Sequence, residues 1–173
     1  MAELADHIRI EPLMSRRFTL DPLRVKHARE MASILGDPSI YGFISGPPMT
    51  PKQVKSLYKR LEAGSPDPGV TWLNWVLRSR DRHDLVGTVQ ATVWPDQGRA
   101  EVAWIVGAAW QGQGIASEAA EQVVRWLERQ EIRLVIAHIH PDHGASQAVA
   151  RHLGLAPTGK VVDGEIEWRA GQA

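Results

Sequence analysis

The change of hydrophobic period along the chain constrains its fold more than any other feature. A short strand-like segment precedes two helical stretches, and three consecutive strand-like segments with a period of two follow. Helix and strand then alternate as far as a final pair of strands. The expected strands lie at 17–20, 70–77, 85–94, 99–106, 134–139, 161–162 and 165–168. The expected helices lie at 25–35, 51–63, 115–130 and 145–153. The order β-α-α-β-β-β-α-β-α-β-β predicts an α+β fold with a sheet of about seven strands flanked by helices.

Two local signals are especially clear. Thr50 suits a helix N-cap, Pro51 suits the first helical position, Gln53 completes a capping box, and Gly64 ends the same helix. Near the C-terminus, Asp163-Gly164 has the chemistry of a type I′ turn. It predicts a hairpin between the last two strands.

Size and composition favour one ordinary globular domain. The 173 residues are 43% hydrophobic and 23% charged, so we expect a single domain over residues 1–173 with a loose extension at residues 1–15. The 20 Lys+Arg balance the 20 Asp+Glu, and this neutrality gives no global field to attract nucleic acid or an anionic membrane. The longest apolar run, Val102–Trp110, is far shorter than the ~20 residues of a membrane span. With no signal-peptide pattern at the N-terminus, we expect a cytoplasmic protein.

The sequence contains no cysteine. This excludes a disulfide scaffold, a thiolate metal site and a cysteine nucleophile. Any acyl transfer must therefore proceed without a thioester on an enzyme cysteine.

The clearest chemical signal lies in the turn that leads into the expected helix 115–130. Gly112 and Gly114 allow the backbone to approach a ligand closely, and the helix start offers unpaired N–H groups. Together these features suit a phosphate or pyrophosphate, although glycines that serve only the turn geometry remain an alternative. A P-loop is excluded because Ile115 stands where it needs Lys, and a dinucleotide fingerprint because Ser117 stands where it needs Gly or Ala.

Several stretches occur in the order of a known family. The loop Gln111–Ala116 fits the pattern Gln/Arg-x-x-Gly-x-Gly/Ala, "RRFTLDPL" precedes a helix, and "HPDHGASQAVARHLGL" follows a buried strand. In these features, over roughly residues 17–169, the chain resembles the GNAT N-acetyltransferases, in their RimJ/RimL-like branch. The resemblance implies a mixed, mostly antiparallel sheet with a splayed central parallel pair, and acetyl-CoA as the co-substrate.

The resemblance also assigns cofactor-binding residues. Main-chain groups of the strand before the loop would pair with the pantetheine arm, whereas the side chains there would serve as core. The N–H groups of the loop would bind the pyrophosphate, Ser117 would add a hydroxyl group, and His143, in place of the family's Asn, would contact pantetheine. The full set is Trp104, Ile105, Val106, Gln111, Gly112, Gln113, Gly114, Ile115, Ala116, Ser117 and His143.

Two residues are candidates for the proton transfers. Amine acetylation needs one proton removed from an ammonium group and one returned to the departing thiolate. Glu101, at the start of the strand that leads to the loop, is the candidate base, with a solvated edge residue as the alternative. Ser146 is the candidate donor to the CoA sulfur, with a helix cap as the alternative. The Tyr that many family members use as the acid is absent, because its place is taken by Ala150.

A rival hypothesis comes from four residues of the same stretch. His138, His140, Asp142 and His143 match His-x-His-x-Asp-His, the zinc signature of metallo-β-lactamase-like hydrolases. That fold needs further ligands well downstream, and His152 is the only later His. We therefore expect no metal and keep zinc hydrolysis as an alternative. A domain that binds acyl-CoA without catalysis is a second alternative.

The predicted activity is direct transfer of acetyl from acetyl-CoA to a primary amine, on a protein N-terminus or a small molecule. The acceptor is expected between the helix pair at residues 25–64 and the last hairpin. Trp72, Trp75 and Trp94 are candidates to line this region, with a core role expected for at least one of them. The expected partners are acetyl-CoA and the amine, without nucleic acid or membrane, and a homodimer is allowed.

Overall fold

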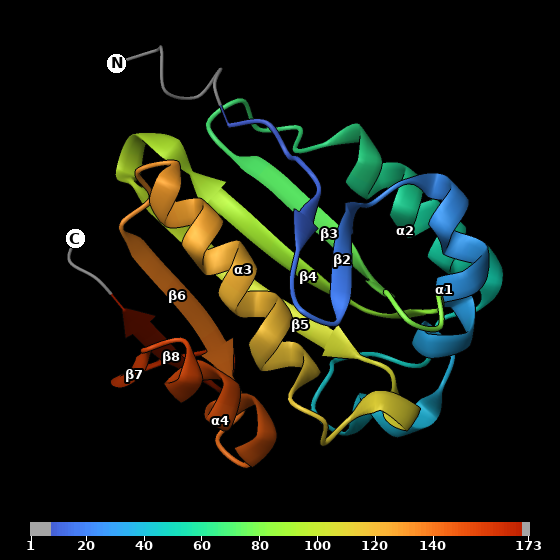
Figure 1. Ribbon diagram of the computed structural model, residues 1–173. Coiled ribbons are helices and arrows are strands. Elements are labelled where there is room, and N and C mark those ends of the chain that lie inside the picture. The colour runs from blue at the N-terminus through green and yellow to red at the C-terminus, as the bar shows by residue number, and fades with distance from the viewer. Residues whose placement is uncertain (1–7, 171–173) are drawn as a thin grey trace.

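The computed structural model describes residues 8–170, in which eight strands form one sheet and helices lie on both of its faces (Figure 1). The strand order is β1-β2-β3-β4-β5-β6-β8-β7. The strands are β1 (Leu13–Met14), β2 (Phe18–Pro22), β3 (Thr71–Ser79), β4 (Leu85–Trp94), β5 (Arg99–Val106), β6 (Leu134–Ile139), β7 (Ala156–Val162) and β8 (Glu165–Ala170). The longer helices are α1 (Ala28–Leu35), α2 (Pro51–Ala63), α3 (Ile115–Arg129) and α4 (Gly144–His152). The predicted α+β class is confirmed.

The sheet is antiparallel except at its centre, where β5 and β6 run parallel. On one side, β5 pairs with β4 along its whole length. On the other side, the pairing with β6 extends only from Arg99–Leu134 to Glu101–Ile136. Beyond Glu101 the two strands diverge, as Figure 1 shows. The predicted splayed parallel pair is thus confirmed, and within the described chain the β6-facing edge of residues 102–106 has no partner strand.

The two faces of the sheet carry different helices. One core cluster joins α3 and α4 to the sheet and includes Val102 and Val106. The other joins α1 and α2 to β3 and β4 and receives Ile105. Because side chains alternate along a strand, Glu101 lies on the same face as Ile105. The candidate base therefore faces the α1–α2 side of the sheet.

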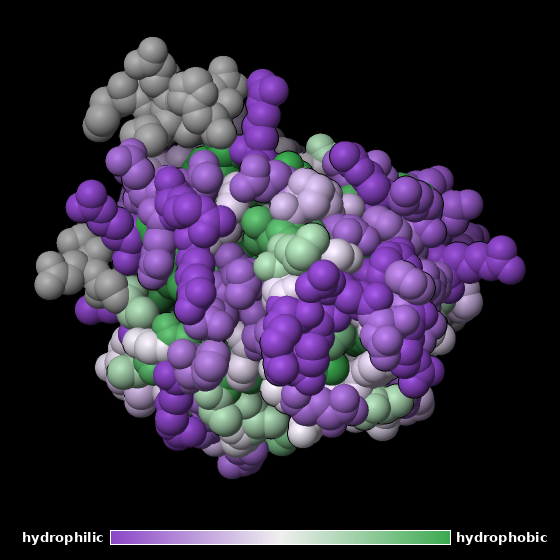
Figure 2. Space-filling model, in the orientation of Figure 1, coloured by the Kyte–Doolittle hydropathy of each residue, from purple (hydrophilic) through white to green (hydrophobic). Residues whose placement is uncertain are grey.

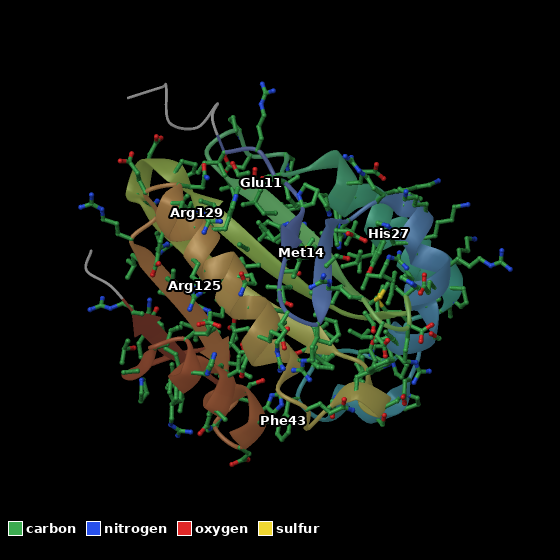
Figure 3. All side chains as sticks on the ribbon, viewed as in Figure 1. Glu11, Met14, His27, Phe43, Arg125 and Arg129 are labelled. Carbon is green, nitrogen blue, oxygen red and sulfur yellow. The ribbon has the colours of Figure 1, made fainter. Side chains whose placement is uncertain are left out.

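The N-terminal segment differs from the loose extension that the sequence predicts. Its described part, residues 8–15, adds β1 to the edge of the sheet and is the source of the eighth strand. Glu11 accepts hydrogen bonds from two buried indole N–H groups, of Trp75 through its carbonyl oxygen (2.8 Å) and of Trp126 through Oε1 (2.6 Å). Figure 3 shows Glu11 and Met14 beside α3. The segment is held in place because buried indole N–H groups need acceptors.

The predictions that rest on short sequence motifs, a helix cap and a tight turn, are confirmed. Thr50 caps α2 and forms a capping box with Gln53, and Gly64 follows the helix with φ of 86°. Asp163 and Gly164 both have positive φ, as a type I′ turn requires. In contrast, β7 begins five residues before the predicted 161–162 segment. Its first residues were not predicted because the exposed side chains of this strand show no hydrophobic alternation, and a register shift interrupts its pairing with β8.

The face that carries α3 is mainly hydrophilic, with hydrophobic residues in small separate groups (Figure 2). Among the described residues, no helix combines the length and the apolar character needed to cross a bilayer.

Candidate active site

A loop with left-handed glycines connects β5 to α3. It passes through a 3₁₀ turn at Ala108–Trp110 and ends at Gly114, the N-cap residue of α3. Gly112 has φ of 74° and Gly114 of 72°, which favour glycine. No side chain caps α3, so the N–H groups of its first turn remain available at the positive end of the helix dipole. This geometry suits an anion, and the loop residues 111–114 are exposed to receive one.

Arg17, from the segment before β2, braces this loop. Its Nη2 donates to the carbonyl oxygen of Gln113 (2.9 Å), and its Nε donates to Oε2 of Glu118 (2.6 Å). Burial alone would raise the pKa of Glu118, but hydrogen bonds from the main chain and side chain of Arg17 outweigh it and lower the pKa. Glu118 therefore stays ionised and holds the guanidinium beside the loop. No pattern in the sequence indicated this role, since Arg17 lies about a hundred residues from the loop and its only signal was its place in "RRFTLDPL".

The remaining loop residues fix the start of α3. The side-chain amide of Gln111 donates to the carbonyl oxygen of Val106 (3.0 Å). Ile115 is buried in the core, while Ala116 and Ser117 are half-buried in the first turn. The side chains of Ile105 and Val106 pack in the two core clusters. A core role therefore fits their side chains, and a cofactor role concerns only their main chain.

A second set of side chains connects β5 to α4. The indole N–H of Trp104 donates to Oγ of Ser146 (3.3 Å), and this oxygen lies 3.4 Å from Nε2 of His143. The N-cap residue of α4 is His143, and Ser146 lies inside the helix, so the helix-cap alternative for Ser146 does not apply. Burial, and to a smaller extent His140, lowers the pKa of His143, so its ring is neutral at pH 7. Because the indole only donates, the hydroxyl hydrogen of Ser146 is left for another acceptor.

Phe43 covers this set from the segment between α1 and α2. Its ring stacks on His143 at 4.4 Å with an interplanar angle of 15° and lies 5.2 Å from His140. Figure 3 shows Phe43 where α4 approaches the loop before α3. The sequence gives no indication of this role of Phe43, because the residue belongs to no periodic pattern and its partners are about a hundred residues away.

The candidate base lies in a third set, at the foot of the splay, the point where β5 and β6 separate. Oε1 of Glu101 is 2.9 Å from Nδ1 of His138, which extends from β6. Nε2 of His138 is 3.9 Å from Oε2 of Glu167 on β8, and Nζ of Lys160 is 3.2 Å from the same oxygen. The Glu101 side chain is 37% exposed, whereas those of His138 and Glu167 are 16% and 12% exposed. Glu101 and His138, which the sequence placed in competing hypotheses, thus form one cluster.

The four residues of the zinc hypothesis do not converge. His138 contacts Glu101, Nδ1 of His140 accepts from the main-chain N–H of Asp142 (3.1 Å), and His143 stacks on Phe43. Across residues 8–170, no group of three or more His, Cys, Asp or Glu side chains could hold a metal ion. The geometry gives the zinc hypothesis no support.

Solved structures with the same fold are numerous. The GNAT-family acetyltransferase from Bacillus anthracis has a TM-score of 0.78 at 16% identity, covering 92% of this chain and 96% of that one. RimL, the ribosomal L7/L12 alpha-N-protein acetyltransferase solved with coenzyme A, has a TM-score of 0.77 at 15% identity, with 93% and 98% covered. The microcin C7 self-immunity acetyltransferase MccE, solved with acetyl-CoA and AMP, has a TM-score of 0.78 at 15% identity, with 91% and 93% covered.

No curated protein matches the sequence. The profile of the Acetyltransferase (GNAT) domain matches residues 17–156, which is most of the chain. This range includes the glycine loop, the splayed strands and α4. The chain therefore belongs to the GNAT acetyltransferase domain family.

Proposed function

We propose that this chain transfers the acetyl group of acetyl-CoA directly to a primary amine. The observation that carries the proposal is the splay between β5 and β6, which opens beside the uncapped N-terminus of α3 and has Glu101 at its foot. Support for acetyl-CoA comes from family membership and from RimL and MccE, whose structures were solved with coenzyme A and acetyl-CoA.

The main chain supplies the proposed cofactor site. The pantetheine arm would hydrogen-bond to the free edge of β5 at Trp104, Ile105 and Val106, as an added strand would. The phosphates would take the N–H groups of the loop and first turn, residues 111–117, with the hydroxyl of Ser117 as a further donor. His143 would contact pantetheine from the start of α4. Arg17 would keep the loop in position for this purpose.

Glu101 and Ser146 carry the proposed proton transfers. Glu101 takes a proton from the acceptor ammonium, and the neutral nitrogen then attacks the thioester carbonyl carbon. The C–N bond forms, the C–S bond breaks, and the nitrogen releases its second proton to solvent. The thiolate takes the hydroxyl proton of Ser146, which regains one from solvent. Because the chain has no cysteine, no acyl-cysteine intermediate intervenes.

The acceptor would approach on the face of Glu101, between the α1–α2 pair and the β7–β8 hairpin. Trp72 and Trp94 are half-buried strand residues, and alternation puts both on this face. Trp75 points to the other face and is fully buried against Trp126, so it belongs to the core. A protein N-terminus and a small-molecule amine are both proposed acceptors. The cytoplasmic location and the homodimer remain predictions.

An acceptor panel tests the proposal directly. Purified protein is mixed with acetyl-CoA and single amines, including peptides with free N-termini, polyamines and small amines, while release of free thiol is followed. We expect thiol release that depends on one class of amine and yields the acetylated product by mass spectrometry. Tight binding of acetyl-CoA without turnover across the panel would favour the non-catalytic alternative.

Replacing Ser146 by Ala should slow turnover moderately. The loss in kcat should stay below the roughly 10²-fold minimum of general acid–base catalysis, because water can replace one hydroxyl donor in an open cleft. The rate should not recover at high pH, since the missing proton donor acts on the thiolate. The measurement is kcat against pH, with Ser33→Ala, an exposed serine of α1, as the matched control. A wild-type rate in Ser146→Ala would remove Ser146 from the mechanism.

A further inference from the structure

The contact between Glu101 and His138 has no role in the function proposed so far. It joins β5 to β6 where their main-chain pairing ends, and its two atoms are 2.9 Å apart. Two lone pairs would repel at this distance, so a proton lies between Oε1 and Nδ1. With Oε1 engaged by His138, Oε2 is the oxygen of Glu101 that remains for the acceptor ammonium.

The far side of the His138 ring is also organised. Nε2 is buried and, within residues 8–170, has no hydrogen-bond partner. The nearest acid, Glu167, lies 3.9 Å away and is held by Lys160 (3.2 Å) and by the Thr158 hydroxyl, which donates to its main-chain oxygen (3.2 Å). The ring thus lies between one carboxylate on β5 and another on β8.

We propose that His138 is a positioning residue of the acetyl transfer. It holds the Glu101 carboxylate across the foot of the splay, so that one oxygen points to the ammonium group of the acceptor. This inference rests on the proposed function, since it needs Glu101 as the base. The charged and titratable groups that face His138 are Glu101 from β5, Glu167 from β8 and Lys160 beside Glu167. His140 follows two residues later, just beyond the end of β6.

Substitutions at His138 separate positioning from packing. In His138→Asn the side-chain amide takes the place of Nδ1–H, whereas in His138→Gln the amide lies where Nε2 was and His138→Leu has no donor. We expect kcat to fall roughly 10- to 100-fold in the Leu and Gln variants, because a misplaced catalytic group costs up to about 10²-fold. The Asn variant should recover most of the rate. The Kd for acetyl-CoA should be unchanged in all three, since His138 is not part of the cofactor site. His152→Leu, on α4, is the matched control.

The decisive measurement combines these variants with Glu101→Gln. If His138 acts through Glu101, the double variant Glu101→Gln with His138→Gln should be no slower than Glu101→Gln alone. The pH profile of His138→Gln should also shift toward that of Glu101→Gln. Additive losses, or no recovery in folded His138→Asn, would overturn the positioning role and leave the proposed function intact. Wild-type activity in Glu101→Gln would instead remove the base role, and the inference with it.

Discussion

Replacing Gly114 by Asp is expected to abolish the binding of acetyl-CoA, which we expect at micromolar strength in the wild type. The new carboxylate would lie at the N-terminus of α3. There it would accept hydrogen bonds from the N–H groups that are proposed to bind the phosphates, and its negative charge would repel the phosphates. Two unit charges 4 Å apart near a protein surface repel by about 4 kcal/mol before screening by salt, roughly a thousandfold in Kd. Isothermal titration calorimetry measures the loss.

Gly114→Asn is the matched control for this variant. Asn has the size of Asp without its charge, and both tolerate the positive φ of this position better than other side chains. We expect Asn to weaken binding much less than Asp, with similar melting temperatures for the two proteins. Equal losses in Asn and Asp would show that shape rather than charge is responsible. Unchanged affinity in folded Gly114→Asp would move the phosphate site away from this loop.

The second large effect is expected from Glu101→Gln. This substitution should preserve the fold and the Kd for acetyl-CoA but lower kcat by roughly 10²- to 10⁴-fold, the usual contribution of a general base. Part of the rate should return at high pH, where more of the amine is already neutral. The measurement is kcat/KM against pH with one good acceptor, for the wild type and the variant.

Glu121→Gln is the matched control, since Glu121 is a carboxylate on α3 that pairs with Arg125. It should leave the profile unchanged. If the profile of Glu101→Gln runs parallel to that of the wild type and within a few-fold of it, the amine arrives neutral. Catalysis would then come from the positioning of the two substrates alone.

The site could be predicted from the sequence only where its parts are adjacent in the chain. The loop from Gln111 to Gly114 and the start of α3 form a continuous segment, and its positive φ angles agree with the glycines. Glu101 and His138 were both noted, but for different chemistries. Their contact joins residues 37 positions apart on strands that are neighbours for only three residue pairs. No pattern within either strand indicates where that pairing stops.

The helices with strong caps and the strands with clear alternation could be predicted from the amino-acid sequence alone. The capping box of Thr50 and Gln53 acts within one helical turn. In β4 and β5, hydrophobic residues recur along the strand as its two faces are buried to different extents. Both signals are local properties of the chain. Three contacts became visible only in the folded chain: Arg17 holds the glycine loop, Phe43 stacks on His143, and the N-terminal segment provides acceptors for buried indole N–H groups. These contacts depend on which distant segments the sheet order brings together. The free energy of such contacts comes from burial and hydrogen bonding between those segments, which no local pattern encodes.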